Sequence, residues 1–203
     1  MRISEKTLEL SFCSQLVQYL GLVDSIWFGL TQRQERELGF DACSRINGRL
    51  VIFQFKASNK IIYQHTRHRQ RRFTIPHRQL ESLQKLANNF RRCVYYVFPD
   101  IGNTLELSRD RNLVSQTWLM DVSRIPYPFP APINRVANHY AYIDPPHCEL
   151  RSKPSEIELI NVKEFGEELL EIGENAEEIV SWLKKEKFIF QGMRAYGLLL
   201  PQR

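Results

Sequence analysis

The chain has 203 residues, of which 43% are hydrophobic and 25% are charged, and its formal net charge is +5. This length and composition suit a globular protein with one domain and an extension. There is no run of about 18 apolar residues, and Met1–Lys6 lack the apolar core of a signal peptide, so membrane-spanning and secreted classes are not expected. The four cysteines are widely spaced, which predicts reduced packing residues in a cytoplasmic protein.

Helical and strand patterns alternate over the first part of the chain. Ser4 is a suitable N-cap, and apolar residues at every fourth position from Leu8 to Leu20 predict an amphipathic helix that ends at Gly21. The dipeptide at 47–48, Asn-Gly, is a strong signal for a two-residue hairpin turn. The elements predicted around it are a short strand at 26–28, a polar turn or excursion at 32–38, a strand at 40–46 and a returning strand at 50–57.

A second helix and two further strands follow a polar stretch. Residues 60–72 are rich in Arg, His and Gln, and residues 76–90 then show helical periodicity, with a proline that suits the first turn. Further strands are predicted at 93–98 and 117–122. This order predicts an α/β domain over residues 1–125, with a central mixed sheet flanked by helices.

The composition changes after Arg124. Four prolines between positions 126 and 132 predict an extended segment, and residues 139–147 indicate a small irregular region. Residues 162–187 are acidic and carry apolar residues on one helical stripe. We therefore predict a second segment, residues 126–203, made of a Pro-rich connection and a C-terminal extension with an acidic helix.

Three polar residues in the predicted hairpin are the strongest functional signal. Gln54 and Lys56 lie two positions apart in an otherwise apolar strand, so they point to the same face, and Asp41 lies on the partner strand. Burying polar groups in such a strand is costly unless something binds them, so we expect a site here. Taken singly, Asp41 could be a strand-edge residue, Gln54 a local hydrogen-bonding group, and Lys56 a side chain that extends to solvent.

Metal-dependent hydrolysis of phosphodiesters suits this pattern. Magnesium prefers hard oxygen ligands, which the side chains of Asp41 and Gln54 and the backbone carbonyl of Phe55 can supply. Lys56 can stabilise the charge that develops on the phosphate, or orient or deprotonate the attacking water.

A further acidic ligand is expected from the first helix. Glu5 and Glu9 lie one turn apart on the same face. Glu9 is the preferred candidate, because Glu5 is equally explained as a charge at the start of a helix.

The arrangement resembles the PD-(D/E)xK nuclease superfamily, whose core is a helix, a strand hairpin, a helix and a strand. The resemblance covers about residues 4–122. The twelve residues between Asp41 and Gln54-x-Lys56 resemble the spacing in archaeal Holliday-junction resolvases, and Gln in place of an acid resembles Mrr-type restriction nucleases. Glu9 is similar to the helix-one acid of those groups. No Pro precedes Asp41, and Gln54 supplies one negative ligand fewer than an acid would.

This resemblance implies a restriction-endonuclease-like core, Mg²⁺ or Mn²⁺ as cofactor and DNA as substrate. It also implies a polar active-site residue on the helix after the Gln-x-Lys strand, for which Gln79 is the candidate, with His77 nearby. Nucleases of this class often dimerise, so a homodimer acting in restriction, phage defence or repair is expected. The implied catalytic set is Glu9, Asp41, Gln54 and Lys56.

A basic segment follows the candidate strand. Residues 60–92 hold nine Lys or Arg and one acid, and clustered cations neutralise phosphates. Tyr63 and Phe73 flank the most basic run and could stack on bases or pack underneath. A solvated loop is the alternative. The predicted DNA-binding residues are Lys60, Arg67, Arg69, Arg71 and Arg72.

The acidic end of the chain supports other interpretations. Residues 149–187 hold eleven acids and six bases, so the helix at 162–187 could bind a protein partner or imitate DNA and cover the basic face. Because Gln54 replaces an acid, the chain could also be a catalytically degenerate nuclease fold that only binds nucleic acid or a partner.

Overall fold

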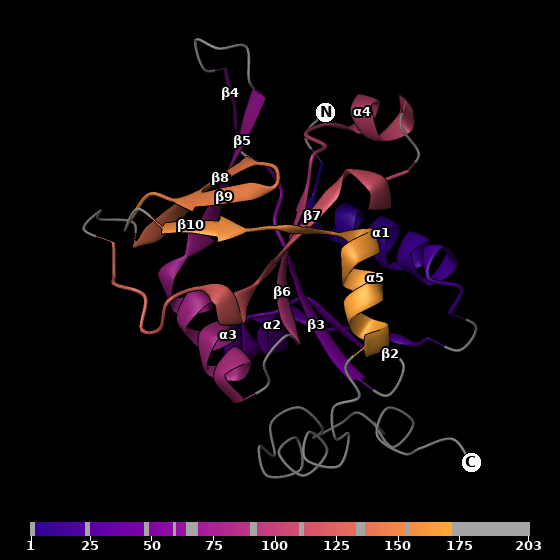
Figure 1. Cartoon of the computed structure of the whole chain (residues 1–203), viewed down its shortest axis with the longest axis horizontal. Coiled ribbons are helices and arrows are strands. Elements are labelled where there is room, and N and C mark those ends of the chain that lie inside the picture. The colour runs from indigo at the N-terminus through magenta and orange to yellow at the C-terminus, as the bar shows by residue number, and fades with distance from the viewer. Residues whose placement is uncertain are drawn as a thin grey trace.

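Two sheets and the helices packed around them make up the part of the chain that the computed structural model describes (Figure 1). None of the helices in this part has the length and apolar character that crossing a membrane requires. The described residues are 3–22, 25–46, 49–58, 60–63, 69–89, 93–109, 112–132, 137–152 and 155–171.

The first sheet has six strands and contains the candidate hairpin. Its neighbouring strands are antiparallel except β3 and β6, which are parallel. In spatial order the strands are β1 (Trp27–Gly29), β2 (Ala42–Ile46), β3 (Arg49–Phe55), β6 (Val94–Pro99), β7 (Thr117–Asp121) and β11 (Ile160–Asn161).

Helices cover both faces of this sheet (Figure 1). On one face lie α1 (Glu5–Tyr19) and α5 (Val162–Glu171), and on the other lies α3 (His77–Asn89). Phe53 of β3 is fully buried on the first of these faces, with its ring 5.7 Å from those of both Phe12 in α1 and Phe165 in α5. One aromatic cluster therefore joins the sheet to both helices.

The second sheet has five strands, and its chain connections pass through both predicted segments. Strands β4 and β5 interrupt the crossover between β3 and β6, and β5 pairs with β8. The strand pairing therefore crosses the predicted boundary between residues 125 and 126. In spatial order the strands are β10 (Ser155–Glu158), β9 (His147–Leu150), β8 (Asn138–Asp144), β5 (Arg69–Pro76) and β4 (Lys60–Tyr63).

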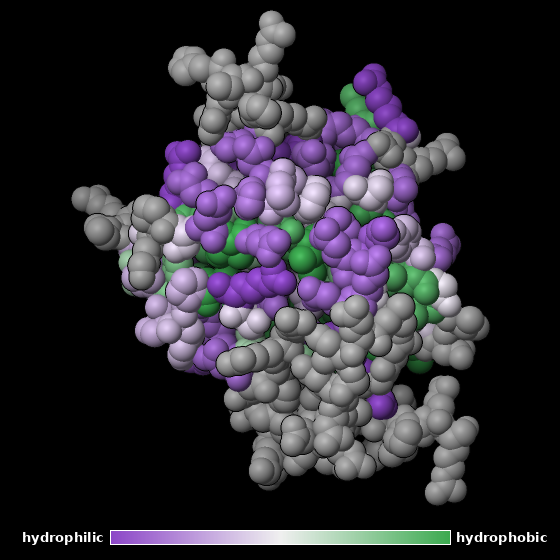
Figure 2. Space-filling view, viewed as in Figure 1, coloured by the Kyte–Doolittle hydropathy of each residue, from purple (hydrophilic) through white to green (hydrophobic). Residues whose placement is uncertain are grey.

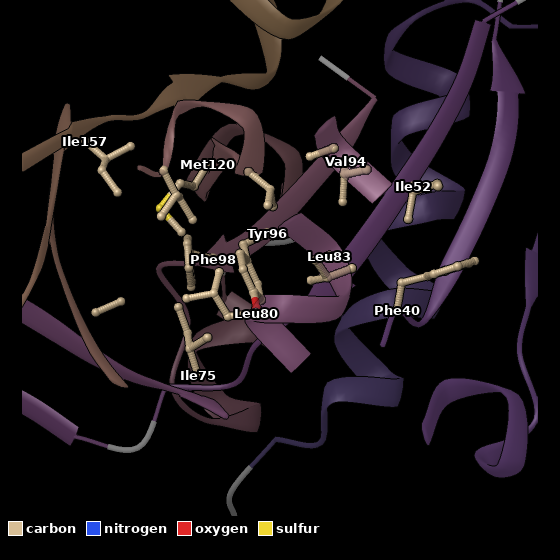
Figure 3. Close-up of a cluster of buried hydrophobic side chains, with 14 of the residues drawn as sticks. Phe40, Ile52, Ile75, Leu80, Leu83, Val94, Tyr96, Phe98, Met120 and Ile157 are labelled. Carbon is tan, nitrogen blue, oxygen red and sulfur yellow. The ribbon is translucent and has the colours of Figure 1, made fainter. Parts of the chain in front are cut away.

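A second core fills the space between α3 and the two sheets. Figure 3 shows side chains from the first sheet, from α3 and from the second sheet meeting in this cluster. Tyr96 and Phe98 come from β6, Leu80 from α3, and Ile75 and Ile157 from the second sheet. The two sheets thus share one apolar interior.

Hydrophilic side chains cover most of the described surface on the side that Figure 2 shows. Hydrophobic ones are visible mainly in a band across the middle of the molecule. All four cysteines are buried and free, as the spacing predicted.

The predicted α/β class, with a mixed sheet flanked by helices, is confirmed. The Ser4 N-cap is also confirmed, because its Oγ accepts the N–H of Thr7 at 3.0 Å. The strands of the hairpin pair in register from Ala42 with Phe53 to Ile46 with Arg49, as the Asn-Gly signal predicted.

The predicted polar turn at 32–38 is wrong, because these residues form helix α2 (Gln32–Leu38). Thr31 and Gln34 form a reciprocal capping box at its start. Gly39 ends it with a left-handed φ of 83°, which a residue with a Cβ adopts only under strain. The helix lacks an apolar stripe, so only the capping residues at its two ends indicate it in the sequence.

The predicted irregular region at 139–147 is also wrong, because it falls in strands β8 and β9. Buried apolar residues such as Ala141 and Cys148 alternate along these strands with outward-facing residues such as Tyr140 and Glu149. A short helix, α4 (Thr104–Arg109), and two 3-10 turns at Val114–Gln116 and Val122–Arg124 were not predicted.

The acidic helix predicted at 162–187 is described only as α5, and its remainder lies outside the described residues. Phe165 and Leu169 of α5 are buried in the cluster that contains Phe53. The first part of the predicted arm is therefore packed against the sheet.

Replacing Phe53 with Ala should lower the free energy of unfolding by about 3–5 kcal/mol, because it opens a cavity between the sheet and two helices. Urea denaturation monitored by circular dichroism measures this loss. The control is Leu10→Ala, at a side chain that is 63% exposed, for which a change within about 0.5 kcal/mol is expected. Equal stabilities of the two variants would contradict the proposed central packing role of Phe53.

Candidate active site at the end of strand β3

Asp41 lies where the chain enters β2. Its N–H donates to the carbonyl of Phe53, and its own carbonyl accepts the N–H of Leu30, both at 3.0 Å. The carboxylate oxygen Oδ2 accepts the N–H of Phe55 and Nε2 of Gln54, both at 2.7 Å. The side chain of Asp41 is thereby fixed against the C-terminal end of β3.

Gln54 is a polar side chain inside a strand that is buried along its whole length. Its Nε2 donates to Oδ2 of Asp41 and, at 3.0 Å, to the carbonyl oxygen of Phe55. Its Oε1 is buried and has no hydrogen-bond partner among the described residues. An unpaired buried amide oxygen costs about 1–3 kcal/mol, so this residue is held in place at a cost to stability.

Lys56 follows β3 and is 5% exposed. Its N–H donates to the carbonyl of Val97 at 3.1 Å, which extends the pairing of β3 with β6. Its Nζ lies 3.9 Å from Oε1 of Glu5, which also accepts the N–H of Ala57 at 3.2 Å. Of the two helix acids, Glu5 is therefore the one in contact with the end of the Gln-x-Lys strand.

Glu9 lies one turn further along α1 and is paired with Lys6. The Nζ of Lys6 donates to Oε1 and Oε2 of Glu9 at 2.7 and 2.8 Å. A Cβ added at Gly29 would come within 3.3 Å of both Glu9 Oε1 and Lys6 Nζ, so the pair lies over β1. Lys6 was missed in the sequence, although a Lys three positions before an acid on a helix indicates such a pair.

Two further polar groups lie beside this site without a partner among the described residues. Tyr96 is the register partner of Gln54 on β6, and its hydroxyl is buried and unpaired. Figure 3 shows that hydroxyl pointing toward α3, beside Leu80. Gln79 of α3 has a buried, unpaired Oε1, and its Cγ lies 3.8 Å from a Cβ placed on Gly39. Tyr96 was missed because its strand is otherwise apolar.

His77 is directed to other partners. Its Nδ1 lies 2.9 Å from Nε2 of His139, and its Nε2 lies 3.7 Å from Glu81. His139 in turn lies 2.8 Å from Oγ of Ser152, and burial, followed by the charge of His77, lowers the pKa of His139 to about 4. His77 therefore belongs to a chain of polar contacts, His77–His139–Ser152, that reaches the second sheet.

The predicted DNA-binding residues have different surroundings. Lys60 lies on β4 and Arg69 on β5, while Arg67 lies outside the described residues. Arg72 is half-buried on β5. Arg71 is 2% exposed and makes ion pairs with Asp100 and Glu106. Its charge is therefore neutralised inside the protein, where a phosphate would have to displace both acids.

The flanking aromatic residues also differ from each other. Phe73 is buried, with its ring 4.8 Å from that of Phe98, so it packs underneath the sheet. The side chain of Tyr63 lies outside the described residues.

The pKa of Asp41 is raised from 3.8 to about 7. Burial is the largest cause, and the nearby charge of Glu5 adds to it. The N–H of Phe55, the charge of Lys56 and the Gln54 amide act in the opposite direction but do not offset burial. Near neutral pH the carboxyl group is therefore poised between its two protonation states, as is common at functional sites.

The amide of Gln54 now directs Nε2, and not an oxygen atom, at Asp41 and the Phe55 carbonyl. A half-turn of its amide would exchange Nε2 for the unpaired Oε1, which would then face Asp41 Oδ2 and the Phe55 carbonyl. Three oxygens placed together repel one another unless a cation lies between them, and oxygen-only ligands suit Mg²⁺. The described residues contain no cluster of three or more His, Cys, Asp or Glu positioned for a metal. Among the three oxygen-bearing groups here, only the carboxylate of Asp41 can carry a negative charge.

Comparison of the chain with family models, with curated proteins and with solved structures finds no match. The geometry of the site defines the chemistry that it can support. That geometry is a half-buried acid, a buried amide with a free oxygen, a backbone carbonyl and a lysine, all at the end of one strand.

Replacing Asp41 with Asn should flatten the dependence of stability on pH. Since its pKa is 3.8 ordinarily and about 7 here, folding favours the protonated form. The resulting stability is fully present below about pH 4 and is lost as the pH rises through about 7. The total loss of stability between pH 4 and 8 should be on the order of 4 kcal/mol, as measured by urea unfolding over that range.

The control for this experiment is Asp144→Asn, on the second sheet. This variant should keep the slope of the wild type. An Asp41→Asn protein that also keeps it would contradict the assignment of the slope to Asp41.

Proposed function

We propose that the chain is a metal-dependent endonuclease that hydrolyses DNA phosphodiester bonds on a restriction-endonuclease-like core. The observation that carries the proposal is the meeting of Asp41, Gln54 and the Phe55 carbonyl at one point, with Lys56 next in the chain. Hard oxygen ligands beside a lysine are what phosphodiester hydrolysis requires.

The order of elements supports the proposal. Helix α1, the β2–β3 hairpin, α3 and β6 occur in this order, with β1 and α2 before the hairpin and β4 and β5 after it. The parallel pairing of β6 with β3 brings the end of β6 beside the Gln-x-Lys strand. The candidate residues thus occupy one rigid corner of the sheet, which suits positioning of a reacting group.

Each residue has a chemical role in this proposal. Asp41, Gln54 and the Phe55 carbonyl would hold Mg²⁺ or Mn²⁺, with Glu9 as a further acidic candidate once released from Lys6. When bound, such a metal lowers the pKa of water and neutralises charge on the phosphate. Lys56 lies within reach of the same point and stabilises the charge that develops on the phosphoryl oxygens. Glu5 keeps the Lys56 ammonium oriented.

The basic residues of β4 and β5 would hold the DNA backbone, and a homodimer would allow both strands to be cut. Arg72 contributes to this binding directly. Arg71 contributes by fixing the position of β5, since its guanidinium is paired inside the protein.

A second candidate function is a degenerate nuclease fold that only binds nucleic acid. The observation that favours it is the orientation of Gln54, whose Nε2 already satisfies both Asp41 and the Phe55 carbonyl. Glu9 is likewise satisfied by Lys6. A site whose acids are neutralised by the protein itself has less need of a metal.

Purified protein should nick supercoiled plasmid DNA in the presence of magnesium or manganese. Lys56→Ala should slow nicking by at least about 100-fold, because the developing charge loses a preorganised cation. The matched control is Lys163→Ala, at an exposed lysine of α5, which should cut at the wild-type rate. If the wild type does not nick, or Lys56→Ala cuts as fast as the control, the enzyme proposal fails.

Replacing Gln54 with Glu separates the two candidate functions. Two adjacent carboxylates repel each other, so this variant should be less stable than the wild type without metal and should gain more stability from magnesium. Thermal unfolding with and without magnesium measures both effects. If wild type shows no magnesium-dependent shift while it binds DNA, the degenerate fold is favoured; a shift abolished by Asp41→Ala favours the enzyme.

A further inference from the structure

The second sheet has one buried and one outward face. Phe73 and Ile75 of β5 and Ala141 and Ile143 of β8 belong to the core cluster. Because side chains alternate along a strand, Arg72 and the tyrosines at 140 and 142 lie on the opposite face. This face therefore carries aromatic and basic side chains where β5 and β8 meet. Arg72 and Tyr140 are half-buried there, and Tyr142 is 8% exposed.

Two arginine–tyrosine stacks occupy this face. The guanidinium carbon of Arg72 lies 4.9 Å from the ring centroid of Tyr140, and that of Arg151 lies 3.9 Å from the ring of Tyr142. The two tyrosines are two positions apart on β8, so the stacks are neighbours. The Nε of Arg72 is buried and has no hydrogen-bond partner among the described residues.

The charge on this sheet changes from one edge to the other. Arg72 pairs in register with Lys60 of β4, so basic residues gather toward that edge. Toward the opposite edge, Glu156 and Glu158 of β10 are exposed. Between the two edges, Glu149 of β9 pairs in register with Tyr142 and lies 3.6 Å from Nε of Arg151. Phosphates would be attracted to the β4–β5–β8 part and repelled from the β10 edge.

The sheet is held rigidly beside the candidate active site. Nη2 of Arg71 donates to the carbonyl of Asp100 at 2.9 Å and to Glu106 at 2.8 Å, and its Nε donates to the Asp100 carboxylate. Asp100 follows β6, which is paired with β3. In the chain, β4 begins four residues after Lys56. A ligand on the outward face would therefore have a fixed position relative to Lys56.

From these observations we infer that the face formed by Arg72, Tyr140, Tyr142 and Arg151 binds the unpaired, single-stranded part of a nucleic-acid substrate. This inference rests on the proposed function and specifies its substrate. Bases stack on tyrosine rings or on guanidinium groups, and the arginines bind phosphates with paired N–H donors. Paired bases in a duplex have no free ring face to offer, so the tyrosines favour a single strand.

The test is fluorescence anisotropy with a labelled oligothymidylate and with a labelled duplex of the same length, using the full chain. Tyr140→Leu and Arg72→Gln should each weaken single-strand binding by about tenfold, while Tyr140→Phe, which keeps the ring, should bind like the wild type. For Tyr140→Leu, duplex binding should change less than single-strand binding. Thermal unfolding of each variant shows whether it is folded.

The matched controls are Tyr127→Leu and Arg109→Gln, at exposed residues outside the strands of the second sheet, and both should bind like the wild type. The inference is overturned if Tyr140→Leu and Arg72→Gln bind as the controls do. It is also overturned if Tyr140→Phe loses as much as Tyr140→Leu, or if Tyr140→Leu weakens duplex and single-strand binding equally.

Failure of this inference and failure of the proposed function have different signatures. If the protein binds the oligothymidylate through Tyr140 but does not nick plasmid, the binding face is supported and the nuclease proposal fails. If the protein nicks plasmid in a way that depends on Lys56, but Tyr140→Leu binds like the wild type, only the inference about the binding face fails.

Discussion

Strand β3 is buried on both faces along its whole length, and it still carries a primary amide. This constraint determines the arrangement around it. Water cannot satisfy the Gln54 amide, so Asp41 and the Phe55 carbonyl must do so. The same lack of water raises the pKa of Asp41 and leaves Oε1 of Gln54 and the hydroxyl of Tyr96 unpaired. The raised pKa of Asp41 and the unpaired polar atoms thus have one cause, the depth at which β3 lies.

Arg71 connects this site with the second sheet. A buried guanidinium without partners would be very costly, and two acids from the segment after β6 compensate it. Gly102 makes room for it, since a Cβ there would lie 2.5 Å from Nη1. The insertion of β4 and β5 into the crossover from β3 to β6 is therefore anchored at the end nearest the site. The outward stacks of Arg72 and Arg151 depend on that anchor for their position.

Local signals in the sequence predicted much of the first sheet. The Ser4 cap, the Asn-Gly turn and the apolar runs of β3 and β6 act over a few residues, so periodicity identified them. The proximity of Asp41 to Gln54 followed from the hairpin register. The contact of Glu5 with Lys56, the pairing of Gln54 with Tyr96 and the burial of Arg71 could not be predicted in this way. They depend on partners 29 or more residues away in the chain, as for Arg71 and Asp100, which no local pattern specifies.

The long-range pairing of β5 with β8 also bears on how the protein is made. While only the first 125 residues have been synthesised, β5 lacks β8 and β7 lacks β11, so both sheets present an open strand edge. Exposed edges of this kind pair readily with other chains. Once they are synthesised, β8 and β11 therefore cover these open edges. A fragment ending near residue 125 would be prone to aggregate, even though it contains the whole candidate site.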